Sequence, residues 1–129
     1  MNIWEKTHAI ATRRIFVFGS NAAGRHGKGS ALEAVRKHGA IYGVGSGPQG
    51  NSYAIPTKDD RLKVLPLSSI NYYVERFLLH AAVTPECHFD VVEIGCGLAG
   101  YAPEEIAPMF RRATIYVHLS ERFKEVLRK

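Results

Sequence analysis

Cysteine and long apolar runs are scarce in this chain of 129 residues. Its two cysteines, Cys87 and Cys96, are too few for a disulfide framework or a cysteine-rich zinc site, and they suit a reducing compartment. No apolar run approaches the roughly 18–20 residues that cross a bilayer. Residues 1–14 are amphipathic and lack the apolar centre of a signal peptide. From these absences we expect a cytoplasmic protein with no membrane partner.

Motifs for metals and dinucleotide cofactors are also missing. Residues 45–50 and 95–100 both match G-x-G-x-x-G, but only the second segment follows a predicted strand and precedes a predicted helix. About 20 residues further on, where a Rossmann domain places an acidic ribose ligand, the chain has Tyr, Val and His at 116–118. We therefore expect no bound cofactor. We also expect no metal, because four of the six histidines show no spacing typical of metal ligands: His38, His80, His88 and His118.

The length and composition fit one globular domain. The chain falls within the range of about 100–150 residues in which single domains cluster. Its 46% hydrophobic and 22% charged residues exclude wholesale disorder. No linker, repeat or low-complexity segment divides it, so we expect one domain over residues 1–129. The formal net charge of +5 indicates an anionic partner without identifying it.

Apolar periodicity predicts strands that alternate with helices. Strands are expected over residues 15–18, 51–56, 89–94 and 114–119. Helices are expected over residues 30–38, from a cap at Ser68 to Ala81, from Pro103 to Phe110, and from a cap at Ser120 to Arg128. Residues 1–12 fit neither pattern, and Ile3 and Trp4 are candidates for packing on the sheet edge. The alternation predicts an α/β layered domain with a largely parallel central sheet.

Glycines concentrate in two places, each directly after an apolar run. Nine of the twelve lie between Gly19 and Gly50, and the others are Gly95, Gly97 and Gly100. Glycine costs backbone entropy, so clusters suit sharp turns or the close approach of a ligand. Ligands of such sheets bind beyond the carboxyl ends of the strands, where both clusters are expected to meet. We prefer the ligand interpretation to a pair of tight connections.

The first glycine loop, residues 19–30, has the features of an anion site. Successive backbone N–H groups and a helix N-terminus can bind one phosphate or pyrophosphate, with added charge from Arg25 and Lys28. The loop is not a Walker A motif, because Ala22 and Gly29 occupy positions where that motif needs Gly and Ser or Thr. A solvated basic turn is the alternative.

Three side chains near the loops invite chemical roles. We expect His26 to form hydrogen bonds within its loop rather than act as a base. Cys96 could be a nucleophile at a helix start, but no base is evident, and a small side chain in a tight phosphate loop is the favoured interpretation. Lys58 follows the strand that ends at Pro56, where a nucleophile, a phosphate contact and a polar loop residue all remain open.

Three segments in order, residues 17–24, 51–58 and 94–101, resemble a macro domain. The resemblance spans about residues 15–117 and is closest to the terminal ADP-ribose glycohydrolases, whose second loop has the sequence I-G-C-G-L-D. It extends to small macro-like proteins of bacteria and their phages. It implies a three-layer α/β/α sandwich with a mixed, largely parallel sheet, and two glycine-rich loops that bind the phosphates of ADP-ribose.

The resemblance also assigns residues. Asn21 matches an Asn near the distal ribose, Lys58 matches the Lys that attacks the ribose anomeric carbon, and Tyr101 is placed beside the ribose. The catalytic Asp of the glycohydrolases is replaced by Ala99, so hydrolysis stays an open question. The candidate catalytic residues are Lys58 and Asn21. The candidate ligand-binding residues are Gly19, Ser20, Asn21, Gly24, Arg25, His26, Gly27, Lys28, Gly29, Gly95, Cys96, Gly97, Leu98, Ala99, Gly100 and Tyr101.

Three functions follow as hypotheses. The first is a protein that binds ADP-ribose or a related nucleotide, as a reader of ADP-ribosylated macromolecules or by sequestering a soluble nucleotide. The second is an ADP-ribosyl glycohydrolase in which Lys58 attacks C1″ and Asp59 or Asp60 supplies the acid/base group. The third is a nucleic-acid-associated structural protein that uses a basic C-terminal face: Arg111, Arg112, Arg122, Lys124, Arg128 and Lys129.

Overall fold

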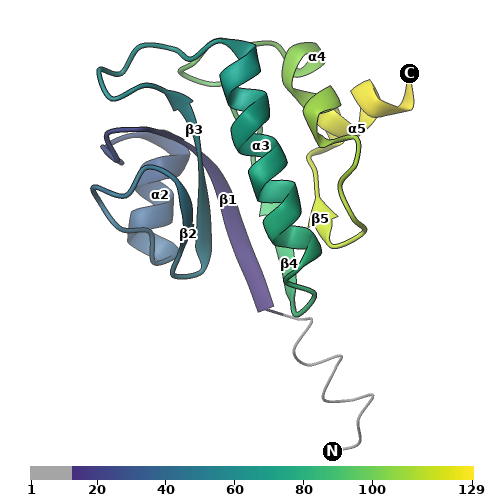
Figure 1. Ribbon diagram of the computed structural model, residues 1–129, viewed down its shortest axis with the longest axis horizontal. Coiled ribbons are helices and arrows are strands. Elements are labelled where there is room, and N and C mark those ends of the chain that lie inside the picture. The colour runs from purple at the N-terminus through teal and green to yellow at the C-terminus, as the bar shows by residue number, and fades with distance from the viewer. Residues whose placement is uncertain (1–12) are drawn as a thin grey trace, which may run out of the picture.

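Five strands form one sheet in the part of the chain that the computed structural model describes, residues 13–129 (Figure 1). The strands are β1 (Arg13–Asn21), β2 (Gly47–Gln49), β3 (Ser52–Lys58), β4 (Cys87–Val91) and β5 (Val117–His118). Their order across the sheet is β2-β3-β1-β4-β5, and only β2 runs antiparallel to its neighbour. The predicted largely parallel sheet is confirmed. The expectation for Ile3 and Trp4 lies outside the described residues.

Helices cover both faces of the sheet because β1 is buried on both. Val17 of β1 packs with α3 (Leu67–Ala82), and Phe18 packs with α2 (Gly29–Lys37) on the opposite face. A short α4 (Pro103–Ile106), the 3₁₀ helix η1 (Ala107–Phe110) and α5 (Glu121–Arg128) join α3 on its side. In Figure 1, α3 crosses in front of the sheet, while α4 and α5 lie beside it.

The larger core is built on aromatic rings between α3 and the sheet. The ring of Phe77 on α3 lies 5.3 Å from that of Phe89 on β4 and 6.4 Å from that of Phe110 on η1. Phe110 in turn lies 6.0 Å from Phe123 of α5. All four rings are fully buried, so this chain of contacts fixes the later helices against the sheet.

Some element boundaries differ from the sequence prediction for physical reasons. Helix α3 begins at Leu67 behind Pro66, so Ser68 is inside the helix and is not its cap. The segment from Pro103 to Phe110 changes from α to 3₁₀ at Ala107, because Pro108 has no N–H to continue the α pattern. The predicted cap at Ser120 is confirmed, since its Oγ accepts the N–H of Phe123 at 3.2 Å.

Strand β2 lies within a segment that the sequence marked only as rich in glycine. Several glycines there permit close backbone contact rather than contact with a ligand. A Cβ at Gly45 would lie 2.2 Å from the carbonyl oxygen of Asn21, and a Cβ at Gly24 would lie 2.2 Å from the carbonyl carbon of Gly43. The tight-connection interpretation therefore fits these positions, and they pack the segment before β2 against the first loop.

Candidate ligand-binding site

A cavity of about 480 Å³ opens at the carboxyl ends of β1, β3 and β4. This volume falls within the range of about 300–1,000 Å³ typical of small-molecule sites. The three strands are parallel, so their ends and the loops that follow meet at one edge of the sheet. In Figure 1 this edge is at the top, where β3 ends. The position agrees with the general rule for ligands of α/β sheets.

The N-terminus of α2 forms one wall of the cavity. Gly29 and Ser30 line it, and Lys28 at the N-cap position makes no capping hydrogen bond with its side chain. Among the hydrogen bonds of the described residues, none is donated by the N–H of Gly29, Ser30 or Ala31. No acidic residue lies in the first turn. We call these three N–H groups the open start of α2, and their partial positive charge favours an anion.

The second glycine loop forms another wall. Gly95, Gly97, Leu98 and Ala99 line the cavity. The loop is closed by hydrogen bonds from the N–H of Gly100 to the carbonyl of Gly97 and from Tyr101 to Gly95. Within residues 13–129, no hydrogen bond is donated by the N–H of Gly97, Leu98 or Ala99. The loop thus offers a second set of backbone donors to the same cavity.

Three cations and one carboxylate line the cavity in the described part of the chain. Arg25, Lys28 and Lys58 supply the positive charge, and none of their side chains forms an ion pair within residues 13–129. The carboxylate is Glu93, whose Oε1 lies 3.0 Å from Nη1 of Arg122. Because Arg122 offsets Glu93, the cavity carries a net positive charge.

Asn21 and Lys58 are neighbours across the β1–β3 pair. The Asn21 amide accepts the N–H of Arg25 and donates to the carbonyl of Arg25, each at 2.9 Å. These two bonds close the start of the first loop and place Arg25 at the cavity. Asn21 therefore positions the first loop, and Lys58 lies beside it on β3.

Twelve of the predicted site residues line the cavity together. They come from the ends of β1 and β3 and from both glycine loops, segments far apart in the sequence. They are Gly19, Ser20, Asn21, Arg25, Gly27, Lys28, Gly29, Lys58, Gly95, Gly97, Leu98 and Ala99.

The other predicted residues do not line the cavity. Gly24 packs against Gly43, and Gly100 closes the turn with Gly97. His26 is only 1% exposed, and its Nε2 lies 2.9 Å from the carbonyl oxygen of Val44, in keeping with a hydrogen-bonding role inside the loop. The Tyr101 hydroxyl donates to the carbonyl of Leu65 at 2.6 Å, which turns it away from the cavity.

Cys96 also points away from the cavity. Its side chain packs against the larger core, and its thiol donates weakly to the carbonyl of Ile94 at 3.6 Å. Burial, followed by the charge of Glu93, raises the pKa of the Cys96 thiol to about 11. A thiol with such a pKa stays protonated near neutral pH, so the structure offers no support for Cys96 as a nucleophile.

Asp59 and Asp60, the predicted acid/base candidates, do not line the cavity. Asp59 Oδ1 accepts the N–H groups of Arg61 and Lys63 at 2.8 and 2.9 Å, and these bonds lower the pKa of its carboxyl. Asp59 therefore stays ionised and shapes a turn. Within residues 13–129, Glu93 is the carboxylate that lines the cavity. No sequence motif indicated Glu93 as a site residue.

Other lining residues also lacked a sequence signal or had a weak one. Val92 and Ile94 directly precede the second loop, so their place at the strand end could have suggested them. Thr57 holds the end of β3 to β1 by donating to the carbonyl of Ser20 at 3.2 Å. Leu62 reaches the cavity from a turn whose geometry depends on the Asp59 side chain.

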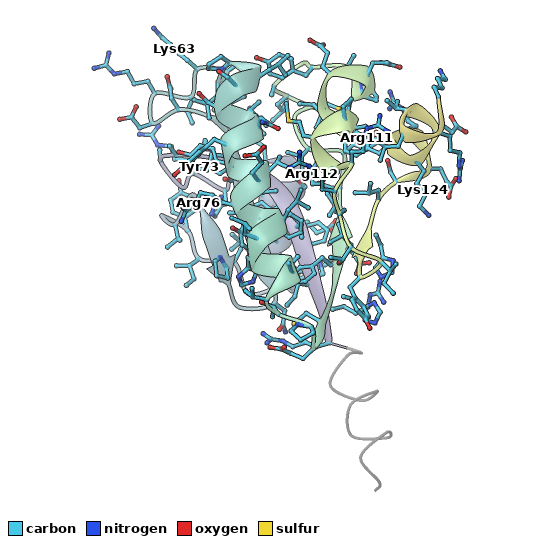
Figure 2. The ribbon with its side chains drawn as sticks, turned by 45° about the vertical axis from the view of Figure 1, so that its right-hand side comes forward. Lys63, Tyr73, Arg76, Arg111, Arg112 and Lys124 are labelled. Carbon is cyan, nitrogen blue, oxygen red and sulfur yellow. The ribbon has the colours of Figure 1, made fainter. Side chains whose placement is uncertain are left out.

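The basic residues at the C-terminal end are partly engaged within the protein. Arg111 donates to the carbonyl of Leu127 at 3.3 Å, and Glu121 lies within 4 Å of both Lys124 and Arg128. Arg111 and Arg112 directly follow η1, and Lys124 lies on α5. Figure 2 shows these three residues to the right of α3. These contacts reduce the free positive charge of this face, and they favour the cavity as the anion site.

Across residues 13–129 no three His, Cys, Asp or Glu side chains are grouped so that they could ligate a metal ion. None of the helices in this range combines the length and apolar character that crossing a bilayer requires. Comparison of the chain with models of protein families, with curated proteins and with solved structures finds no match.

Proposed function

We propose that the protein binds ADP-ribose or a related nucleotide in the cavity, as a reader of ADP-ribosylated macromolecules or by sequestering the soluble nucleotide. One observation carries the proposal: Gly29 and Ser30 of the open start of α2 line the same cavity as Gly97, Leu98 and Ala99, whose N–H groups donate no hydrogen bond within residues 13–129. A diphosphate has enough oxygens to accept from both sets. Hydrogen bonds to charged groups contribute about 1.5–3 kcal/mol each, so two such sets support micromolar binding.

Calorimetric titration with ADP-ribose tests the proposal, with Gly97 as the site of the variants. A Cβ at Gly97 meets no atom within 4 Å, and its backbone is not in the left-handed region, so Gly97→Ala and Gly97→Glu are both expected to fold. Gly97→Glu places a carboxylate beside the second loop and should weaken binding at least about 100-fold. Gly97→Ala should bind within about threefold of the wild type. Equal binding by Gly97→Glu and the wild type would refute the site.

A second candidate function, ADP-ribosyl glycohydrolysis, is supported by one observation. Lys58 lines the cavity beside Asn21 and has no ion pair within the described residues. In this hypothesis the Lys58 amine attacks C1″ of the ribose, the bond between C1″ and the peptide side chain breaks, and Glu93, the carboxylate that lines the cavity, protonates the departing side chain. Water then adds at C1″, which releases ADP-ribose and restores the Lys58 amine. The catalytic Asp of the resembling glycohydrolases is Ala99 here, which places hydrolysis second.

Mass spectrometry of an ADP-ribosylated peptide separates the two functions. If the protein is a hydrolase, the wild type releases ADP-ribose, and Lys58→Ala abolishes release while it still binds the nucleotide. Lys63→Ala is the matched control, because Lys63 lies in the adjacent turn and does not line the cavity. An intact peptide after incubation with the wild type would leave binding as the function.

A further inference from the structure

Glu93 lines the cavity beside three cations but forms an ion pair with none of them. We call Arg25, Lys28 and Lys58 the cavity cations. Within residues 13–129, no carboxylate oxygen of Glu93 lies within 4 Å of a side-chain nitrogen of a cavity cation. Opposite charges attract more strongly where water is partly excluded, and the Glu93 side chain is only 28% exposed. A Glu93 carboxylate that turned toward the cavity cations would therefore compete with an anionic ligand.

Arg122 of α5 holds the Glu93 carboxylate instead. Its Nη1 donates to Oε1 of Glu93 at 3.0 Å, and within residues 13–129 no other cation lies within 4 Å of this carboxylate. Arg122 does not line the cavity and is 29 residues from Glu93 in the sequence. The pair thus connects the cavity wall to the C-terminal helix.

The first turn of α5 fixes the place from which Arg122 reaches Glu93. The Oγ of Ser120 accepts the N–H of Phe123 at 3.2 Å, and the fully buried ring of Phe123 lies 6.0 Å from that of Phe110. Arg122 directly precedes this buried ring. Its own side chain is 64% exposed, so the ion pair contributes little to the stability of the fold. We therefore expect the pair to matter more for the cavity than for folding.

We propose that Arg122 is a positioning residue of the ligand site: it holds Glu93 away from the cavity cations, which stay free for the phosphates of the ligand. This inference rests on the proposed function. Without Arg122, the Glu93 carboxylate would pair with a cavity cation and act as an internal competitor of the ligand. The first turn of α5 is then part of the site, although none of residues 121–128 lines the cavity.

A double-mutant cycle measured by calorimetry tests the inference, with ADP-ribose and inorganic pyrophosphate as probes. Arg122→Ala removes the group that holds Glu93, and it should lower the affinity for both probes about five- to tenfold. In the Glu93→Gln background, the same substitution should change the affinity by about twofold or less, because an uncharged amide does not compete for the cavity cations. Urea unfolding should give Arg122→Ala nearly the stability of the wild type, because the pair is largely exposed.

Two further variants are matched controls. Arg122→Lys keeps the positive charge and should stay within about threefold of the wild-type affinity. Arg128→Ala removes one positive charge from the same helix, at a residue that pairs with Glu121 at 3.8 Å and does not line the cavity. Its affinity should stay within about twofold of the wild type.

The pH dependence of binding gives a readout that a merely structural role would not change. The loss of affinity caused by Arg122→Ala should shrink as the pH falls from 7 to 4, because a protonated Glu93 no longer pairs with the cavity cations. ADP-ribose is the probe for this series, because its diphosphate stays ionised over this range of pH.

The outcomes separate the inference from the function on which it rests. Normal binding of both probes by Arg122→Ala overturns the inference and leaves the proposed function intact. Equal losses in the two backgrounds of the cycle, or a loss that is the same at pH 7 and pH 4, would show that Arg122 does not act through Glu93, which also overturns the inference. If the wild type binds pyrophosphate but not ADP-ribose and the cycle gives the expected result, the positioning role stands and the nucleotide function fails. If the wild type binds neither probe, both fail.

Discussion

Helix α2 begins at Gly29 with no side-chain cap and no acidic residue in its first turn, whereas α5 begins behind Ser120, whose hydroxyl accepts the N–H of Phe123. Helix α5 also has Glu121 in its first turn. The chain's own groups thus accept hydrogen bonds at the start of α5, while the N–H groups at the start of α2 have no acceptor within residues 13–129. An uncapped start costs about 1 kcal/mol of stability, which a ligand that accepts those N–H groups would recover.

The same contrast holds for charged side chains. Arg14 pairs with Asp90, and Arg122 pairs with Glu93, both on or near the sheet. Arg25, Lys28 and Lys58 line the cavity and have no ion pair within residues 13–129. Cations without an ion pair within residues 13–129 therefore gather at one edge of the sheet, where Glu93 is the paired group that also lines the cavity. This difference indicates where binding, rather than folding, determines the choice of residue.

Capping α2 in the way that α5 is capped should have the largest effect. Lys28 has φ −148° and ψ 159°, which suits an N-cap residue, so Lys28→Asp is expected to cap the open start. The carboxylate would occupy the donors and reverse the charge, lowering affinity for ADP-ribose more than about 100-fold in calorimetry. The free energy of unfolding in urea should rise by about 1 kcal/mol.

Arg36→Asp is the control for that charge reversal. It makes the same change in net charge at the other end of α2, where Arg36 is exposed and does not line the cavity. Its affinity should stay within about threefold of the wild type, while stability falls slightly because a cation is lost from the last turn. If the Lys28→Asp variant is stabilised and still binds normally, the open start of α2 does not bind the ligand.

Removing the cap of α5 should produce the converse result. Ser120→Ala is expected to lower the free energy of unfolding by about 1 kcal/mol and to leave ligand affinity unchanged. Ser68→Ala is the matched variant, because Ser68 lies inside α3 and makes no capping bond, so its effect should stay below about 0.5 kcal/mol. Equal losses in the two variants would mean that the Ser120 hydrogen bond contributes little to α5.

Local patterns predicted the parts of this molecule that depend on local physics. The apolar run in β1, the periodicity of α3 and the cap at Ser120 are each encoded within a few residues. The two glycine loops were predicted to meet because parallel strands end at one edge, and Gly19 and Gly97 indeed line one cavity.

The remaining features depend on contacts between distant segments or on a single turn. Strand β2 is three residues long and contains Pro48, so no alternating pattern marks it. Gly24 lies against Gly43 rather than at the cavity, a contact that spacing does not reveal. Leu62 reaches the cavity only because Asp59 folds the turn around it, and a leucine at a positive φ contradicts the propensity on which sequence prediction relies.

The smallest predicted effect concerns the paired charges away from the cavity. Arg14 donates two hydrogen bonds to the carboxylate of Asp90, and these bonds, more than the nearby charges, lower the pKa of Asp90. The pair therefore stabilises the fold above the unfolded Asp pKa of about 3.9, and this contribution is lost as the pH falls through the lower folded value. Because both side chains are about half exposed, Arg14→Gln should cost only about 0.5 kcal/mol at pH 7.

Urea unfolding of the wild type and Arg14→Gln between pH 7 and pH 2 measures this contribution. The difference between the two proteins should shrink below pH 4 and in high salt, and affinity for ADP-ribose should not change at pH 7. A difference that persists to pH 2 would assign the effect of Arg14 to packing of its side chain on the sheet. A loss of ligand affinity would instead show that the Arg14–Asp90 pair contributes to the site, and the unpaired cations would no longer mark the groups that bind the ligand.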